Sequence, residues 1–140
     1  MASIYKDIRA ALESKLASVS GLPSISYENV QFDRQTGTSY IETQFPPTAR
    51  RPAVRGTNPQ QRYDGVFRLI CYAPEGNGPA AAEDLADKVL DAFDAATDVS
   101  YTNGDGASFK VSIDYAERES GGLDTPFYYV PVTIGFYIFN

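Results

Sequence analysis

The sequence has 140 residues, of which 43% are hydrophobic, and this size and composition predict one globular domain spanning residues 1–140. Its formal net charge of −6 argues against non-specific binding to a nucleic-acid backbone as its main activity, because such binding requires a positive surface. The absence of histidine excludes the Ser-His-Asp and Cys-His triads and the common zinc sites. No apolar run is long enough to cross a membrane, and we expect no signal peptide at the start.

The first 45 residues predict a helix followed by two strands. The helix is amphipathic, ends near Gly21 and Pro23, and has an apolar residue at every fourth position: Ile4, Ile8, Leu12 and Leu16. Two apolar runs, at 25–32 and 38–45, flank the turn-forming stretch 33–37. We therefore expect a hairpin here, with a bulge or bend where the apolar spacing slips at 28–29.

The remaining residues predict further strands around a second helix. A strand over 63–74 is apolar on both faces, which indicates a central position and a buried Cys71. The second helix is expected at Ala80–Ala96, followed by strands at 99–101, 107–117 and 127–139, with an Asn-Gly turn before the second of these. Runs of strands broken by two helices predict an α+β fold with one mostly antiparallel or mixed sheet and both helices packed on one face.

The stretch PPTARRPAVRGTNPQQRYDG, from Pro46 to Gly65, shows no hydrophobic periodicity and predicts a long irregular loop at about 46–64. It carries four arginines and a single acidic residue in an otherwise acidic chain: Arg50, Arg51, Arg55 and Arg62. Compact domains rarely keep an irregular loop of this length without a function. We expect the arginines to form an arm that docks on carboxylates or carbonyls of a neighbouring molecule.

Two further surfaces are candidates for contacts with partners. The sheet face away from the helices carries several aromatic residues, which is more apolar surface than a small isolated domain needs, and we place Tyr129, Tyr137 and Phe139 in a partner interface. The second helix is expected to present an acidic face to a subunit contact or to a central channel: Glu83, Asp87, Asp91, Asp94 and Asp98. Acidic residues facing a channel would repel the phosphates of DNA passing through it.

Signals for enzymatic activity are weak. Asp114, Glu117 and Glu119 could act as paired carboxylates, but they lie at the predicted exposed end of a strand, where solvation is the simpler interpretation. The acids of the second helix are spread over several turns and do not gather into a cation site. We therefore expect no catalytic residue, no metal and no cofactor.

Four segments together carry a family resemblance: IYKDIRAALESKL, ISYENVQFDRQTGTSYIETQFPP, GVFRLICYAPEGNGPAAAEDLADKVLDAFD and the long closing strand. They resemble the tail terminator proteins of long-tailed bacteriophages. The resemblance implies a small α+β domain that forms a hexameric ring on the head-proximal end of the tail tube. Such a ring stops further addition of tube protein and offers a surface to the head-side connector, and DNA passes through without specific binding.

The resemblance also implies that the mid-chain loop takes part in ring or tube contacts, and that the protein is a virion component assembled in the bacterial cytoplasm. It implies no catalytic residue. Another neck component, such as a head–tail joining protein, stays open as an alternative. A small-ligand-binding domain or an enzyme is a more distant one.

Overall fold

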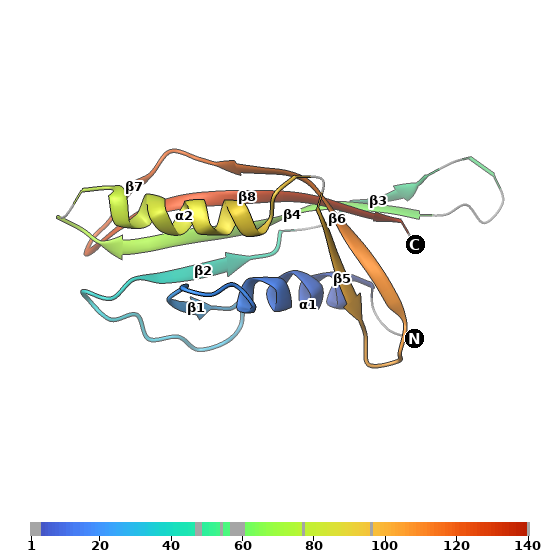
Figure 1. The fold of residues 1–140 in the computed structure, drawn as a ribbon, viewed down its shortest axis with the longest axis horizontal. Coiled ribbons are helices and arrows are strands. Elements are labelled where there is room, and N and C mark those ends of the chain that lie inside the picture. The colour runs from blue at the N-terminus through green and yellow to red at the C-terminus, as the bar shows by residue number, and fades with distance from the viewer. Residues whose placement is uncertain are drawn as a thin grey trace.

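The computed structural model describes residues 4–46, 49–53, 55–56, 61–76, 78–95 and 97–139. This part of the chain contains two helices and eight strands (Figure 1). In chain order they are α1 (Ile4–Ala17), β1 (Ser24–Ser26), β2 (Tyr40–Gln44), β3 (Ala49–Pro52), β4 (Gln61–Pro74), α2 (Ala80–Ala92), β5 (Asp98–Thr102), β6 (Ser108–Arg118), β7 (Gly122–Asp124) and β8 (Phe127–Phe139).

All eight strands belong to one mixed sheet with the order β1-β2-β4-β8-β6-β5, to which β3 adds on β4 and β7 adds on β8. The pair β1–β2 is parallel and the other pairs are antiparallel. The central strands β4 and β8 pair along their full shared length, from Arg62 opposite Phe139 to Pro74 opposite Phe127. The predicted α+β class with one mixed sheet is therefore confirmed.

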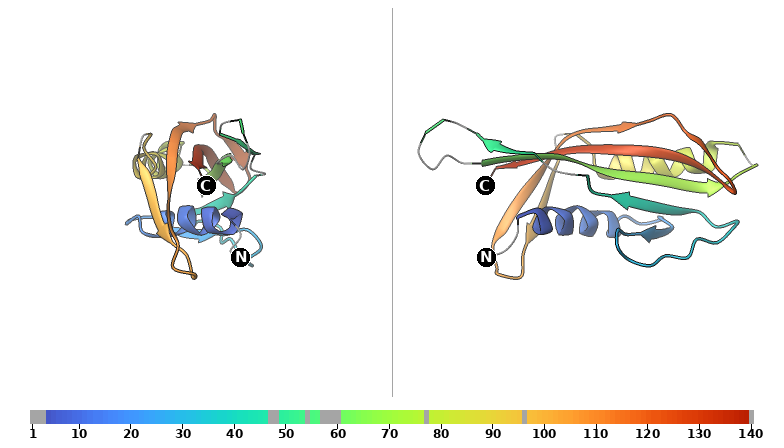
Figure 2. Two further views of the ribbon diagram at one scale, coloured as in Figure 1. Left: turned by 90° about the vertical axis from the view of Figure 1, so that its right-hand side faces the viewer. Right: turned by 180° about the vertical axis from the view of Figure 1, so that it is seen from behind.

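Both helices contribute their apolar stripes to a single core on one face of this sheet. Leu12 of α1 and Val89 of α2 are fully buried, and so are alternate residues of the central strands, such as Phe67 and Ile134. Burial of each such side chain stabilises the fold by about 1.5–3 kcal/mol. Cys71 lies in the same core as predicted, and its burial raises the pKa of its thiol to about 12. Figure 2 shows the two helices on the same side of the curved sheet.

The predicted hairpin between residues 25 and 45 is wrong. Strand β1 has only three residues and runs parallel to β2, and residues 27–39 form the connection between them. Val30, which was assigned to the first strand, is 62% exposed. Phe32 packs from the connection against the ring of Tyr40, with 5.2 Å between centroids. A parallel pair needs a connection of a dozen or more residues, which this segment supplies.

Three further elements differ from the sequence-based expectation. The stretch 46–64 is not irregular throughout, because β3 pairs with the first residues of β4; residues 47, 48, 54 and 57–60 lie outside the described residues. Helix α2 ends at Ala92, where Phe93 leaves helical geometry, so Asp94 follows the helix and Asp98 begins β5. Tyr115 lies two residues after Ile113, and strand alternation predicts both on one face, but a register shift after Ile113 places Tyr115 on the opposite face. Among the described residues no helix is long and apolar enough to cross a membrane.

Candidate assembly surfaces

The sheet face opposite the helices, here called the outer face, changes character along its length. Strand alternation places Tyr40, Tyr72 and Tyr129 in one row across β2, β4 and β8. At the other end of β4, Arg62 lies opposite Phe139 on this same face. One end of the outer face is thus aromatic and the other combines arginine with aromatic residues.

At the aromatic end of the outer face the side chains pack against one another. Tyr40 and Tyr72 stack with 4.5 Å between ring centroids and are 5% and 8% exposed, and Phe127 meets Tyr40 edge-on. Burial raises the pKa of Tyr72. The Glu42 carboxylate, which accepts a hydrogen bond from the Tyr72 hydroxyl with 3.1 Å between the oxygens, raises this pKa further. Tyr129 is half-buried against Tyr72, at 6.0 Å. These tyrosines form a secondary core and do not leave a large free aromatic surface.

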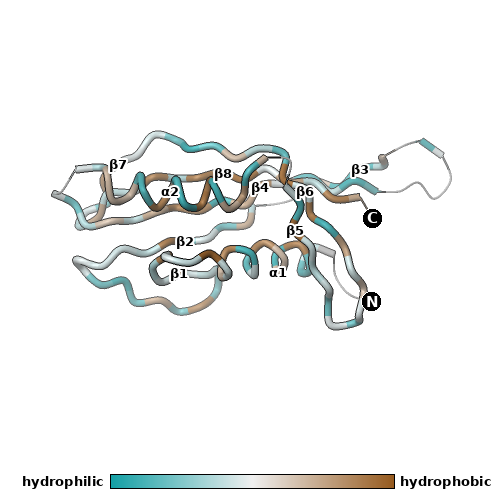
Figure 3. Tube along the Cα trace, in the orientation of Figure 1, coloured by the Kyte–Doolittle hydropathy of each residue, from teal (hydrophilic) through white to brown (hydrophobic). Residues whose placement is uncertain are grey.

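At the opposite end the chain forms a projection that we call the arm, comprising residues 49–53, 55–56 and 61–64. It extends beyond the body of the domain, next to the C-terminal end of β8 (Figures 1 and 2). Every residue of β3 is exposed. Figure 3 shows polar colouring along the arm and apolar colouring along much of β8. Both faces of β3 meet solvent, so the arm contributes to the hydrophobic core through Tyr63 of β4, which is buried.

A three-residue ion-pair cluster, the arm clasp, holds the two arm strands together. Arg51 lies directly opposite Arg62 across β3 and β4, an arrangement of like charges that by itself destabilises a strand pair. Asp64 lies between them: its Oδ2 accepts from Arg51 Nη2 at 2.7 Å and its Oδ1 from Arg62 Nε at 2.7 Å. Partial burial raises the pKa of Asp64, but the hydrogen bonds from Arg62 and Arg51 outweigh it and lower that pKa overall.

The arm arginines differ in the contacts they make within the chain. Arg62 also lies over the rings of Tyr137 and Phe139, at 4.6 and 5.6 Å from their centroids, and Phe139 is 45% exposed. Arg50 and Arg55 are exposed and form no ion pair with another described residue. Among the described residues the arm therefore presents two arginines without an ion-pair partner, Arg50 and Arg55, and the base of the arm carries the partly exposed Phe139.

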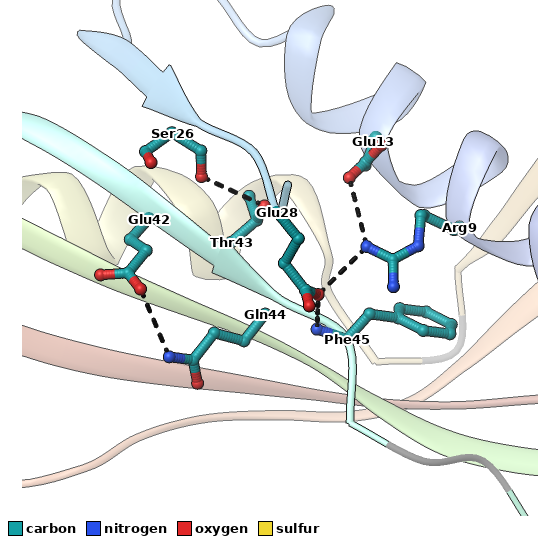
Figure 4. A network of polar contacts seen from close by, with 8 residues as sticks. All are labelled: Arg9, Glu13, Ser26, Glu28, Glu42, Thr43, Gln44 and Phe45. Carbon is teal, nitrogen blue, oxygen red and sulfur yellow. Dashed lines mark hydrogen bonds and ion pairs between the residues drawn. The ribbon is translucent and has the colours of Figure 1, made fainter. Parts of the chain in front are cut away.

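Near the end of β2 there is a groove that the sequence did not predict, which we call the β2-edge groove (Figure 4). Glu28 accepts hydrogen bonds from the backbone N–H of Phe45 and from Arg9 Nη1, the latter at 3.0 Å, and Arg9 also lies 4.8 Å from the centre of the Phe45 ring. The cavity has a volume of about 570 Å³. Its lining residues are Ser26, Tyr27, Glu28, Asn29, Glu42, Thr43, Gln44, Phe45 and Pro46.

The acids expected on one helix face are divided among several local roles. Glu83 pairs with Arg118 at 3.1 Å, whereas Asp87 and Asp91 are exposed on α2. Asp94 accepts from the N–H of Ala95 at 3.1 Å, after the helix has ended. Asp98 accepts from the hydroxyl of Ser112, at 2.9 Å.

The carboxylates in the described segments were the candidates for metal binding and acid–base chemistry. No group of three or more His, Cys, Asp or Glu side chains there is arranged to hold a metal ion. Of the three carboxylates at the end of β6, Glu119 forms an ion pair with Arg68 at 3.1 Å, and Asp114 and Glu117 are exposed. These contacts agree with a solvated strand end.

Comparison with known protein families decides which class of protein this is. A family model described as "Phage tail terminator protein" matches residues 7–136, which is nearly the whole chain. The chain belongs to the phage tail terminator family. The terminator is accordingly a structural component of a phage tail, and its family implies contacts with tail-tube and head-side proteins.

A solved structure supports the fold of this terminator. It is 22% identical in sequence, covers 95% of this chain and 94% of its own, and superposes with a TM-score of 0.69. At this identity the likeness establishes the shared fold alone. No curated protein matches the terminator's sequence.

The structure brings together some of the residues predicted for partner contacts in the terminator and separates others. Arg51, Arg62, Tyr137 and Phe139 meet at the base of the arm, whereas Tyr129 lies in the aromatic cluster at the far end of β8. Sequence reasoning missed Asp64, whose signal was its position as the single acid in an arginine-rich stretch. It also missed the β2-edge groove, where the slip of apolar spacing at 28–29 marked a turn, with Asn29 at a φ of 59°.

Proposed function

We propose that the terminator forms a ring, most simply a hexamer, that caps the head-proximal end of the tail tube. The ring prevents further addition of tube protein and provides the docking surface for the head-side connector, and DNA passes through it without specific binding. The observation that carries this proposal is the arm, an exposed cationic projection on a chain of the tail terminator family. A domain has no need of such a projection for its own core.

A ring requires two different surfaces on each copy, because head-to-tail contacts join unlike surfaces. The arm, with Arg50 and Arg55 exposed, is one such surface. Tyr137 and Phe139 at its base add an apolar component, and aromatic residues combined with arginine are enriched where proteins bind one another. An acidic surface on the next copy completes the contact.

Loss of the protein tests the proposal directly. In infected cells lacking it, we expect electron microscopy to show tails longer than normal and without heads. Tails of normal length without heads would instead assign it to head–tail joining. The purified protein is expected to assemble to about 92 kDa, the mass of six 15.3 kDa chains, either alone or on tube ends. A solitary monomer that ignores tail tubes would overturn the proposal.

The exposed acids of α2 are proposed to face the channel. Replacing Asp87 and Asp91 with lysine reverses their charge, and we expect attraction to phosphate to slow DNA ejection several-fold while ring assembly persists. Ejection is measured by the fluorescence of a dye that binds released DNA. The matched control is Asp105→Lys on an exposed turn. Unchanged ejection in the double variant would show that this face does not line the channel.

A further inference from the structure

We propose that the β2-edge groove receives the arm of a second copy of this chain. This proposal rests on the ring proposed above and specifies the surface of the neighbour that binds the arm. The sequence suggested the acidic face of the second helix for that contact, but the structure favours the groove on grounds of charge, backbone pairing and position.

The charge of the groove is complementary to that of the arm. Glu28 and Glu42 line the groove, and no lysine or arginine is among its lining residues. A second cavity, of about 500 Å³, shares Tyr27 and Glu28 with the first and adds Glu13 and Arg9. The two cavities together thus contain three acids and one base. Arg50 and Arg55 of an incoming arm would supply the missing positive charges, and guanidinium–carboxylate pairing also favours a defined geometry.

The backbone of the groove can accept a strand. Pairing between β1 and β2 ends at Ser26 opposite Glu42, so β2 has no strand partner on this side beyond that point among the described residues. The N–H of Phe45 is satisfied there by the Glu28 side chain and not by a strand. Within the described segments, strand β3 likewise pairs with β4 on one side only. Two such open edges are natural partners for strand addition.

Helix α2 has no open backbone edge to which a strand could add. The backbone groups of an α-helix are used by its internal hydrogen bonds, so Asp87 and Asp91 offer charge but no edge with which β3 can pair. Charge also prevents the wrong pairing of two arms with each other, because each carries exposed arginines. The arm is therefore selective for an acidic strand edge.

The groove and the arm are different surfaces of one chain, so their contact is of the head-to-tail type that builds rings. The groove lies at the end of β2, where the chain continues toward the arm (Figure 1). Each copy would then hold the arm of one neighbour in its groove, near the base of its own arm. Its own arm would extend to the groove of the next copy.

Complementation between two defective copies tests the proposal. An arm-defective copy carries Arg50→Glu and Arg55→Glu, and a groove-defective copy carries Glu42→Lys. We expect each alone to lose the ring species at concentrations where the wild type is fully assembled. An equimolar mixture should form a one-to-one dimer that does not grow, because one arm and one groove remain intact. Size-exclusion chromatography with light scattering measures these species.

Controls separate charge effects from misfolding. Glu42→Gln keeps an oxygen that can accept the Tyr72 hydroxyl, and we expect it to weaken assembly at least about tenfold with an unchanged unfolding midpoint. Asp105→Lys should assemble as the wild type does. Rings that persist in Glu42→Lys, or that are lost in the Asp87→Lys and Asp91→Lys double variant, would overturn the groove assignment. The proposal that the wild type forms a ring would still stand. Failure of the wild type itself to assemble would instead overturn the proposed function.

Discussion

Replacing Asp64 with alanine is expected to loosen the arm and to abolish ring assembly while leaving the rest of the fold intact. Asp64 is the residue that separates Arg51 from Arg62, which lie directly opposite each other across the arm strands. Without its carboxylate the two guanidiniums repel, and β3, every residue of which is exposed, has no buried side chain to compensate. The free energy of unfolding should change by no more than about 1 kcal/mol, because exposed ion pairs contribute little to global stability.

Hydrogen exchange monitored by mass spectrometry distinguishes local from global loosening. In Asp64→Ala we expect backbone amides of 49–53 and 61–64 to exchange at least about tenfold faster, with no change along the pairing of β6 with β8. Asp105→Ala, which removes the same charge from an exposed turn, should leave both regions unchanged. Equal protection of the arm in the Asp64 variant would show that the clasp does not order it.

The clasp also has an expected pH dependence. Because the pKa of Asp64 is lower in the folded state, its contribution is present above the usual aspartate pKa of about 3.9 and is lost as the pH falls through the lower folded value. Arm protection in the wild type should therefore be constant between about pH 5 and 8, where the carboxylate is ionised in both states.

The sequence predicted the parts of this fold that bury one face against the core. Helices α1 and α2 have apolar stripes at helical spacing, and β6 and β8 alternate along much of their length, so one-sided burial left a clear period in each. The bulge after Ile113 was not predicted, because Tyr115 continues the apolar alternation in the sequence although its side chain lies on the other sheet face. Periodicity reports burial, and it becomes silent or misleading where an irregular backbone changes which face is buried.

The arm and the β1–β2 pair were not predictable for different reasons. Strand β3 is exposed on both faces and so has no alternation of apolar and polar residues. Around Val30 and Phe32 the problem is the reverse, since Phe32 packs on the outer face from a loop and imitates a strand residue. The four arginines were predicted to form a functional segment, but the grouping of Arg51 and Arg62 around Asp64 depends on cross-strand register, which the local sequence does not encode.

The largest effect on stability is expected at Phe67, because its ring joins three parts of the core. It is fully buried in β4 and contacts Phe45 beyond β2 and Phe93 at the end of α2, with ring centroids 6.4 and 6.0 Å apart. Phe67→Ala should lower the free energy of unfolding by about 3–5 kcal/mol. The substitution leaves a cavity between the segments that carry Phe45 and Phe93, and these cannot both move in to fill it. That loss is a large fraction of the roughly 5–15 kcal/mol by which a domain is stable.

The neighbouring Val66 is the matched control, because it lies in the same strand, points to the outer face and is only half-buried. Val66→Ala should cost about 1 kcal/mol in denaturant unfolding experiments. A similar loss in both variants would contradict the assignment of a helix-covered core on one face. Phe45 contacts Phe67 and also lines the β2-edge groove, so Phe67→Ala should disturb the groove and weaken assembly. The Phe67 variant should therefore lose its assembled form at denaturant concentrations at which the Val66 variant stays assembled. Core packing and arm binding are linked at this residue, and a difference between the two variants in both measurements would establish that link.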